Sequence, residues 1–243
     1  MGEPNSLKSI QERLTEALNW ELSIQEVTLL MDHLAYVLEK NKAVNLTRID
    51  NPKAGILFHI EDSLAALPEI AAAPEGALVD MGSGGGYPGI PLAIVSGRRG
   101  CLIEATKKKA AIIEGFLQKS GLSSQIRVEA QRIEEVSLQH QGGFSLATAR
   151  ALSSLPALLE LAAPLLMMGG ELIAYKGREY QAELEGAKAL QAILGMEFTG
   201  KRELVLSDGI TTRTLLTFTK TAAPNRPLPR RPGQAQTHPL LFT

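Results

Sequence analysis

The sequence predicts an α/β fold in which seven strands form a mostly parallel sheet, preceded by a helical extension. Three observations lead to this prediction. From Ala77 onward, short apolar runs alternate with helical stretches, as in β/α units joined by crossover connections. The first apolar run ends in a glycine-dense turn. Two extended runs near the end of the chain are joined by Ser207-Asp208-Gly209, a hairpin signal that predicts one antiparallel strand within the sheet.

Helical periodicity dominates the chain ahead of this alternation. Apolar residues recur at helical spacing from residue 5 to about residue 41. A second helix is predicted to open at Ser23, because Ser23 and Glu26 have the spacing of a capping box. We expect a turn-rich break at residues 41–52, further helix at residues 54–67, and a linker with two prolines at residues 68–76.

Five β/α units are expected between this linker and the hairpin. Strands are predicted at residues 77–80, 100–104, 125–130, 144–149 and 170–175, and helices at residues 89–97, 107–120, 131–137, 153–167 and 178–195. The hairpin runs are Glu197–Leu206 and Thr211–Thr219. Right-handed crossovers would bring the C-terminal ends of the first, second and fourth strands to one ligand crevice.

The chain therefore divides into three predicted parts. Residues 1–73 form a helical extension packed on the core, residues 74–220 form the α/β domain, and residues 221–243 form a basic, proline-rich arm. This arm holds five prolines and three arginines, and no acidic residue follows Asp208. Its composition predicts an extended segment rather than a regular helix. A solvated tail is the ordinary interpretation of such a segment, and an arm that contacts phosphate is the alternative.

Composition excludes several classes of protein. The chain has 243 residues, is 44% hydrophobic and 21% charged, and contains no apolar run as long as a membrane-spanning helix. No export signal precedes the first helix, so a cytoplasmic protein is expected. The single cysteine, Cys101, forms no intramolecular disulfide, and the four histidines lack ligand spacing, so no metal site is expected.

The turn after the first strand carries the strongest chemical signal. A dinucleotide loop G-x-G-x-x-G would need a third glycine at position 87, where this chain has Tyr87. The spacing G-x-G-x-G is instead met by Gly82, Gly84 and Gly86, with Asp80 two residues ahead. This is the loop that binds S-adenosylmethionine (SAM) in class I methyltransferases, whose Rossmann-like fold has seven strands. An ordinary glycine-rich connection is the alternative for this loop taken alone.

A second acidic residue strengthens the SAM interpretation. Glu104 ends the second predicted strand, 22 positions after Gly82. Nucleotide-binding proteins of this type place a carboxylate about 20 residues beyond the loop, where it accepts hydrogen bonds from ribose hydroxyls. SAM is thus predicted as the cofactor and S-adenosylhomocysteine (SAH) as its product.

The methyl acceptor is inferred from the end of the fourth predicted strand. Its residues Ala147 to Arg150 lack the Asn/Asp-Pro-Pro-aromatic motif of enzymes that methylate exocyclic amines, and Cys101 lies on the wrong strand to attack a pyrimidine. Guanine N7 has a free lone pair and no proton, so it needs neither device. A cation at the crevice would suffice to hold it, and Arg150 is the candidate. Arg150 could instead be a solvated strand-end residue.

Several segments together resemble the bacterial 16S rRNA (guanine-N7) methyltransferase G family, also called glucose-inhibited division protein B. The resemblance runs from about Asn41 to the C-terminus. It rests on Asn45-Leu46-Thr47, His59-Ile60-Glu61-Asp62-Ser63, the Asp80–Pro91 loop, Arg132-Ile133-Glu134-Glu135, Ala149-Arg150-Ala151, Ala174-Tyr175-Lys176-Gly177 and Pro229-Arg230-Arg231-Pro232-Gly233.

The resemblance implies methylation of one guanine in the decoding-region loop of 16S rRNA, in the small ribosomal subunit. It also implies roles for individual residues. The residues implied to bind the cofactor are Asp80, Gly82, Ser83, Gly84, Gly86, Glu104, Ile133, Glu134 and Arg150. Those implied at the reacting centre are Arg150, Asn45, His59, Asp62 and Lys176, and those implied to contact RNA are Lys108, Lys109, Arg132, Arg230 and Arg231.

Two departures from the family pattern affect these assignments. Glu104-Ala105 stands where the family commonly has Asp-Ser, and Lys107-Lys108-Lys109 replaces a usual Gly-Lys-Arg. The lysine that contacts RNA therefore remains open among the three. His59 and Asp62, three residues apart on a helix, could also simply pair with each other.

Other functions are kept as alternatives. A methyltransferase acting on a small molecule would need neither the basic arm nor the Lys107–Lys109 cluster. A methyltransferase acting on another RNA is a further alternative, and a non-catalytic SAM- or RNA-binding protein would transfer no methyl group. A nicotinamide oxidoreductase is disfavoured by Tyr87. The expected partner is 16S rRNA within the small ribosomal subunit, with no membrane, and the expected state is a monomer.

Overall fold

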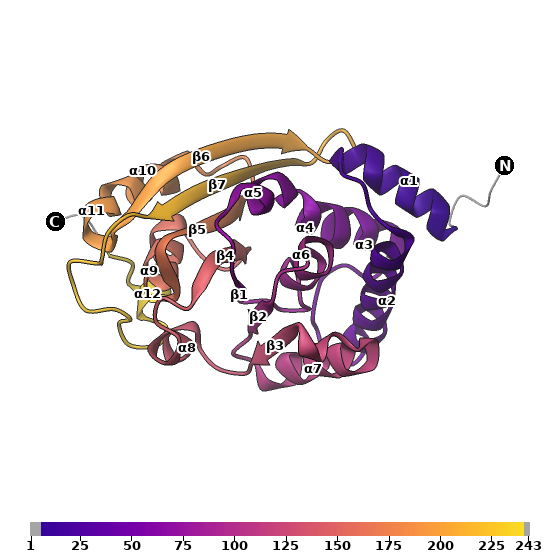
Figure 1. Ribbon diagram of the computed structural model, residues 1–243, viewed down its shortest axis with the longest axis horizontal. Helices are drawn as coiled ribbons and strands as arrows, with labels where there is room; N and C mark the ends of the chain where they lie inside the picture. Colours follow the sequence, from indigo (N-terminus) through magenta and orange to yellow (C-terminus); the bar gives the residue numbers. More distant parts are fainter. Residues whose placement is uncertain (1–5, 241–243) are drawn as a thin grey trace.

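The computed structural model describes residues 6–240 and has the predicted α/β architecture (Figure 1). Seven strands form one sheet in the order β3-β2-β1-β4-β5-β7-β6. The first five strands are parallel, and β7 lies antiparallel between β5 and β6. The strands are β1 (Leu78–Met81), β2 (Gly100–Ile103), β3 (Ile126–Glu129), β4 (Phe144–Arg150), β5 (Leu166–Lys176), β6 (Met196–Val205) and β7 (Thr212–Lys220).

The central strands are buried on both faces, which is why their sequences are continuous apolar runs rather than alternating ones. Side chains alternate between two cores. Leu78 and Leu102 point into the core that holds the N-terminal helices, whereas Val79 and Cys101 point into the core on the opposite face. Helices therefore cover both faces of the sheet, as crossover connections require.

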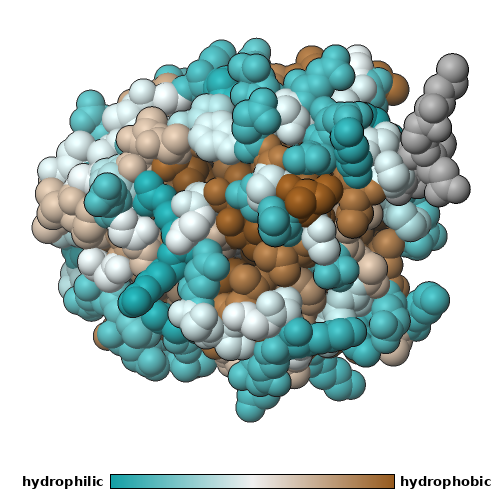
Figure 2. All heavy atoms as spheres, turned by 45° about the vertical axis from the view of Figure 1, so that its right-hand side comes forward, coloured by the Kyte–Doolittle hydropathy of each residue, from teal (hydrophilic) through white to brown (hydrophobic). Residues whose placement is uncertain are grey.

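One core is closed by helices from the N-terminal extension together with the first two crossovers. These are α1 (Leu7–Leu18), α2 (Ile24–Asn41), α3 (Pro52–Gly55), the π-helix η1 (Ile56–Glu61), α4 (Asp62–Leu64), α5 (Leu67–Ala72), α6 (Gly89–Ser96) and α7 (Lys107–Ser120), followed by the 3₁₀-helix η2 (Leu122–Ser124). Figure 2 shows the outer surface of the molecule, turned so that the right-hand side of Figure 1 comes forward. Apolar side chains gather near the middle of this view, with hydrophilic ones around them.

The opposite core is closed by α8 (Ile133–Gln139), α9 (Leu155–Leu165), α10 (Gln181–Ala189) and α11 (Gln191–Leu194). The helix predicted at residues 178–195 is thus two helices. They separate at Leu190, whose backbone N–H bonds to the carbonyl of Ala187 three residues earlier rather than four. The predicted end of α9 at residue 167 was also too late, because the chain becomes extended at Leu166, two residues after Pro164.

The first two predicted helices are confirmed, but the helix predicted at residues 54–67 is interrupted by a turn at residues 65–66, and the linker prediction is wrong. Ser23 and Glu26 form the expected capping box, in which the Ser23 side chain accepts from the Glu26 N–H and the Glu26 carboxylate accepts from the Ser23 N–H. Residues 68–76 are not a linker, because most of helix α5 lies there. Pro68 occupies the first turn of this helix, where a missing N–H costs no hydrogen bond.

The C-terminal arm is not a solvated tail, which was the ordinary interpretation of its composition. Residues 221–240 fold back against α8 and α9 and contain a short helix, α12 (Gln234–Thr237). Ala235 and Leu240 are buried in the same core as α9. Composition did not predict this, because the apolar contacts that order the segment come from helices distant in sequence. Residues 1–5 and 241–243, parts of the predicted extension and arm, lie outside the described residues.

Candidate active site

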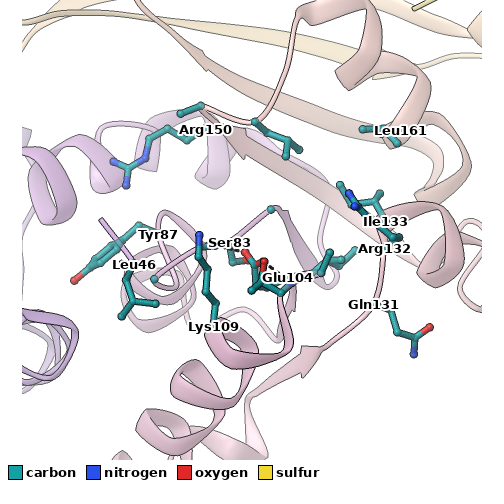
Figure 3. A pocket seen from close by; sticks show the side chains of 18 of the residues that line it. Leu46, Ser83, Tyr87, Glu104, Lys109, Gln131, Arg132, Ile133, Arg150 and Leu161 are labelled. Atoms are coloured by element: carbon teal, nitrogen blue, oxygen red, sulfur yellow. Dashed lines mark hydrogen bonds between the residues drawn. The ribbon is translucent and has the colours of Figure 1, made fainter. Parts of the chain in front are cut away.

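A cavity of about 480 Å³ opens at the C-terminal ends of β1, β2 and β4 (Figure 3), where open α/β sheets bind their ligands. Figure 3 shows Glu104 beside Ser83 in the middle, Ile133 and Arg132 on one side, and Arg150 and Tyr87 on the other. Its lining also includes Leu46, Thr47, His59, Gly82, Gly84, Gly85, Ile103, Ala105, Thr106, Lys109, Gln131, Glu134, Ala151, Leu152, Leu161 and Gln236.

The three glycines of the loop have different structural roles. Gly82, Gly84 and Gly86 all have positive φ, at +74°, +58° and +91°. A Cβ on Gly82 would lie 2.6 Å from Leu152, and one on Gly86 would lie 2.6 Å from Ile90. A Cβ on Gly84 would meet no atom within 4 Å. Gly84 thus leaves space where a ligand can approach the backbone, whereas Gly86, contrary to its predicted contact with the cofactor, does not line the cavity.

Asp80 lies behind this loop rather than in the cavity. Its carboxylate is fully buried and accepts hydrogen bonds from the Gly89 N–H at 3.1 Å and from the Thr148 hydroxyl at 2.9 Å. Burial raises the pKa of Asp80 to about 6. The structure therefore differs from the predicted cofactor contact: Asp80 fixes the loop to α6 and β4, and these elements then shape the cavity.

Glu104 is placed to receive a ligand. Its Oε2 accepts from the Gly84 N–H at 3.0 Å and its Oε1 from the Thr106 N–H at 2.7 Å. Each carboxylate oxygen can accept a further hydrogen bond. Because Glu104 lines the cavity, those remaining acceptors are available to hydroxyl groups of a bound ribose, and the longer arm of glutamate is fixed by the two backbone amides.

At the other end of the cavity, Arg150 belongs to a buried charge cluster. Its guanidinium donates to the Phe58 carbonyl and to Asp62 Oδ2, both at 2.9 Å. Asp62 is 1% exposed and also accepts from Arg213, at 2.6 Å to Oδ1 and 3.0 Å to Oδ2. Arg150 is therefore not a solvated strand-end residue. The Asp62 carboxylate orients two arginines and offsets one of their two positive charges.

His59 contacts the cavity without pairing with Asp62. Its ring stacks on Tyr87 with centroids 4.3 Å apart, and its Nε2 lies 3.0 Å from the Thr47 hydroxyl. Burial, with a smaller contribution from the Arg150 charge, lowers the pKa of His59 to about 4. The imidazole is consequently neutral at neutral pH and adds no positive charge to the arginine cluster.

The remaining residues implied at the reacting centre lie outside the cavity lining. Asn45 is exposed next to Leu46. The Lys176 ammonium donates to the Ser153 carbonyl and to Glu183, each at 2.7 Å. Lys176 therefore fixes the turn between β4 and α9 to α10 and does not reach into the cavity.

The five cations predicted to contact RNA fall into three groups. Lys109 and Arg132 line the cavity, and Lys108 and Arg231 are exposed. Arg230 is different, since its guanidinium makes a two-pronged ion pair with buried Glu160. Of the three lysines at the start of α7, Lys109 is the one in the cavity wall.

Sequence reasoning missed several residues of the site. Arg213 carries a faint signal, a charged residue in an otherwise Thr/Leu-rich strand, but nothing local links it to Asp62. Ala151 has φ of +54°, an unusual value for alanine, directly after Arg150. Gln236 and Leu161 gave no chemical signal at all.

Comparison with known proteins now connects this geometry with a family. A family model described as rRNA small subunit methyltransferase G matches residues 26–217. The chain belongs to this family. A protein of Synechococcus sp. named ribosomal RNA small subunit methyltransferase G is 32% identical over 247 residues, covering 98% of this chain and 95% of that protein. One of the same name from Desulfitobacterium hafniense is 32% identical over 232 residues, covering 94% and 96%.

Solved structures support the fold. An O-methyltransferase from Bacillus cereus, solved with SAH, superposes with a TM-score of 0.57 at 21% identity, covering 88% of this chain and all of that one. A SAM-dependent O-methyltransferase from Thermotoga maritima gives a TM-score of 0.51 at 16% identity, covering 78% and 73%. The predicted class I fold is confirmed.

Family membership also confirms the predicted activity class, a SAM-dependent rRNA methyltransferase. The cavity fits the cofactor on two observations: the open space over Gly84, and a carboxylate 20 residues further on that is anchored with acceptors to spare. No helix within residues 6–240 is long and apolar enough to cross a bilayer. The same residues contain no group of three or more His, Cys, Asp or Glu side chains suited to a metal ion.

Proposed function

We propose that this enzyme transfers the methyl group of SAM to N7 of a guanine in the decoding-region loop of 16S rRNA. The observation that carries the proposal is Arg150, whose guanidinium is fixed at one end of the donor cavity by Asp62 and the Phe58 carbonyl. Its family relatives carry the name of ribosomal RNA small subunit methyltransferase G. A held arginine matches the electron-rich edge of guanine.

The chemistry of the site suits guanine N7, which needs no base, and not a pyrimidine carbon, which needs a thiolate nucleophile. When bound, SAM supplies an electrophilic methyl group together with its own leaving group. Guanine N7 attacks with a free lone pair, so no base is needed. His59, whose pKa burial lowers to about 4, would be a weak base. Cys101, the single cysteine, is buried in β2, and burial raises its pKa to about 11, which leaves no thiolate nucleophile.

The chain's own contribution is to hold the acceptor in line. Because the N7 lone pair must stay free for the methyl group, Arg150 is proposed to hold the neighbouring O6 or a phosphate. Asp62 and Arg213 are proposed to position Arg150, since their ion pairs fix the guanidinium in one orientation. Tyr87 and Leu46 wall this end of the cavity and keep water out.

Cations around the cavity are proposed to bind the RNA backbone. Lys109 and Arg132 line the cavity. Lys108 and Arg231 are exposed, and each lies within a few residues of a cavity-lining residue in the sequence. Their ammonium and guanidinium groups suit phosphate contacts, which make affinity fall as salt rises. Arg230 is withdrawn from this role, because both prongs of its guanidinium are used by Glu160. The expected partner is the small ribosomal subunit; the expected monomer and cytoplasmic location stay predictions.

Small ribosomal subunits that lack the modification provide the test. They are incubated with methyl-labelled SAM and the enzyme, and the labelled nucleotide is mapped. We expect one labelled N7-methylguanine in 16S rRNA, lost with Arg150→Ala and retained with Arg127→Ala, an exposed strand arginine. Label in another RNA, at another atom, or only in a small molecule would overturn the assignment.

A further inference from the structure

The segment from Pro229 to Leu240, here the C-terminal strap, returns to the donor cavity after the sheet is complete. Gln236 of this strap lines the cavity together with Ile133 and Leu161. The family model that matches this chain ends at residue 217, so the strap lies beyond the matched range. Its position beside the cavity gives it a role other than that of a basic tail.

Three anchors fix the strap. Arg230 makes two parallel hydrogen bonds to Glu160 on α9, at 2.5 Å and 2.6 Å, and Glu160 is 2% exposed. The Gly233 N–H donates to Glu134 Oε1 on α8 at 2.6 Å. Ala235 and Leu240 are buried in the core beneath. With a charged pair, a backbone contact and apolar packing on both sides of Gln236, the strap is a fixed wall.

The Gln236 amide is free to serve a ligand. Its side chain makes no hydrogen bond to any other residue in the range 6–240, although its neighbours on both sides are held. A glutamine amide offers one acceptor and two donors in a plane. The same pattern pairs with the N6/N7 edge of adenine, where the N6 amino group donates and N7 accepts.

The surroundings of Gln236 match a purine. Ile133 and Leu161 provide apolar surface for the faces of a ring, and Glu134 Oε1 accepts from the Gly233 N–H of the strap. Figure 3 shows Ile133 at the end of the cavity away from Arg150, with Glu104 between them. A ribose on Glu104 would therefore direct its base toward Ile133 and the strap.

We infer that Gln236 recognises the adenine edge of SAM through paired hydrogen bonds, and that the C-terminal strap is part of the donor site. The inference rests on SAM as cofactor and is independent of the methyl acceptor. Its consequence is that base specificity is set by a residue over 100 positions from the ribose carboxylate.

The test compares SAH with its inosine analogue, S-inosylhomocysteine, by calorimetric titration. On the N6/N7 edge of hypoxanthine an oxygen replaces the N6 amino donor while N7 still accepts, so one of the two paired hydrogen bonds is lost. The wild-type protein should prefer SAH by about tenfold. Gln236→Met keeps side-chain length and removes the amide, so it should bind SAH about tenfold more weakly and show no preference. Gln234→Met on the same short helix, outside the cavity lining, should behave as the wild type.

Two outcomes overturn the inference. Gln236→Met could retain the preference for SAH, whether or not both affinities fall, in which case the side chain shapes the cavity without reading the base. Hydrogen exchange gives an independent readout: bound SAH should slow exchange of the amides at 233–238 in the wild type and less so in Gln236→Met. Equal protection in the two proteins would remove the strap from the donor site. Neither measurement involves RNA, so failure here is distinct from failure of the proposed acceptor.

Discussion

The carboxylate of Glu104 accepts a hydrogen bond from the Gly84 N–H at 3.0 Å, so the two halves of the donor site hold each other before any ligand arrives. Gly84 belongs to the loop after β1, and Glu104 follows β2. Because β1 and β2 are adjacent and parallel, their C-terminal ends meet at one edge of the sheet. A preorganised site of this kind spends little free energy on ordering when the cofactor binds.

Gly84→Asp should abolish cofactor binding while sparing the fold. The new side chain would point into the open space over Gly84, where it excludes the ligand. We expect SAH affinity to fall more than about 100-fold, measured by calorimetry. Gly97→Asp is the matched control, since Gly97 also has positive φ and open space around its Cβ, but ends α6 away from the cavity. If the two variants bind SAH equally, the loop does not carry the cofactor.

Asp62→Asn should slow methyl transfer without weakening SAH binding. The substitution removes the charge that fixes Arg150 and Arg213, and Arg150 becomes free to move. A misplaced catalytic group lowers turnover steeply, here by at least about tenfold in kcat. Asp32→Asn, an exposed aspartate on α2, is the control and should leave kcat unchanged. Wild-type kcat in Asp62→Asn would show that the cluster does not position Arg150.

Substitution of the two neighbouring arginines of the strap should have very different effects on stability. Arg230→Ala leaves buried Glu160 without its partner, so we expect a loss of about 3 kcal/mol in the free energy of unfolding, measured with urea. Arg231→Ala removes an exposed side chain and should change stability by less than about 0.5 kcal/mol. Equal stabilities would contradict the anchoring role of the Arg230–Glu160 pair. Reduced affinity for ribosomal subunits in Arg231→Ala alone would support its phosphate contact.

Acid should destabilise the protein through its buried histidines. Burial lowers the pKa of His33 to about 3 and that of His59 to about 4, from 6.5. Below pH 6.5 the unfolded chain therefore binds more protons at these two positions than the folded chain does. The free energy of unfolding consequently decreases as the pH is lowered. Asp80 acts in the opposite sense, because its raised pKa of about 6 lets the folded state keep a proton between pH 6 and 3.8. Because two histidines act against the single Asp80, the net effect of acid is a decrease in the free energy of unfolding.

His33→Gln isolates one of these contributions. Glutamine can still donate to the Gly85 carbonyl that His33 Nε2 contacts at 2.9 Å, but it does not titrate. The stability lost between pH 7 and pH 5 should therefore shrink by about 2 kcal/mol, in urea unfolding at the two pH values. The comparison uses the difference between the two pH values, so lost ring packing in the variant cancels. An unchanged pH dependence would show that His33 is not the group that titrates.

The parts of the fold that sequence could predict are those with local causes. The capping box of Ser23 and Glu26, the glycines of the loop and the hairpin at Asp208 each act within a few residues. The strands of the sheet followed from apolar runs of the right length. Boundaries failed where packing overrides local preference, as at Leu190.

The parts that could not be predicted depend on contacts between distant residues. Asp62 and Arg213 are 151 positions apart, and Arg230 and Glu160 are 70 apart. Composition indicated a basic arm, because the arginines are visible in sequence and their buried partners are not. The orientation of Asp80 could not be predicted for the same reason. Its position before the loop was correctly located, but its hydrogen bonds to Gly89 and Thr148 point its carboxylate away from the cavity.

The hydrogen bond between Gly233 and Glu134 spans 99 positions and has a consequence for synthesis of the chain. When residues up to Lys220 have left the ribosome, all seven strands are present, but Gln236 and its wall of the cavity are not. The last dozen described residues must leave the exit tunnel before Gln236 can take its place. Until then Glu160 also lacks its partner Arg230, so this wall of the cavity and its anchor are completed together.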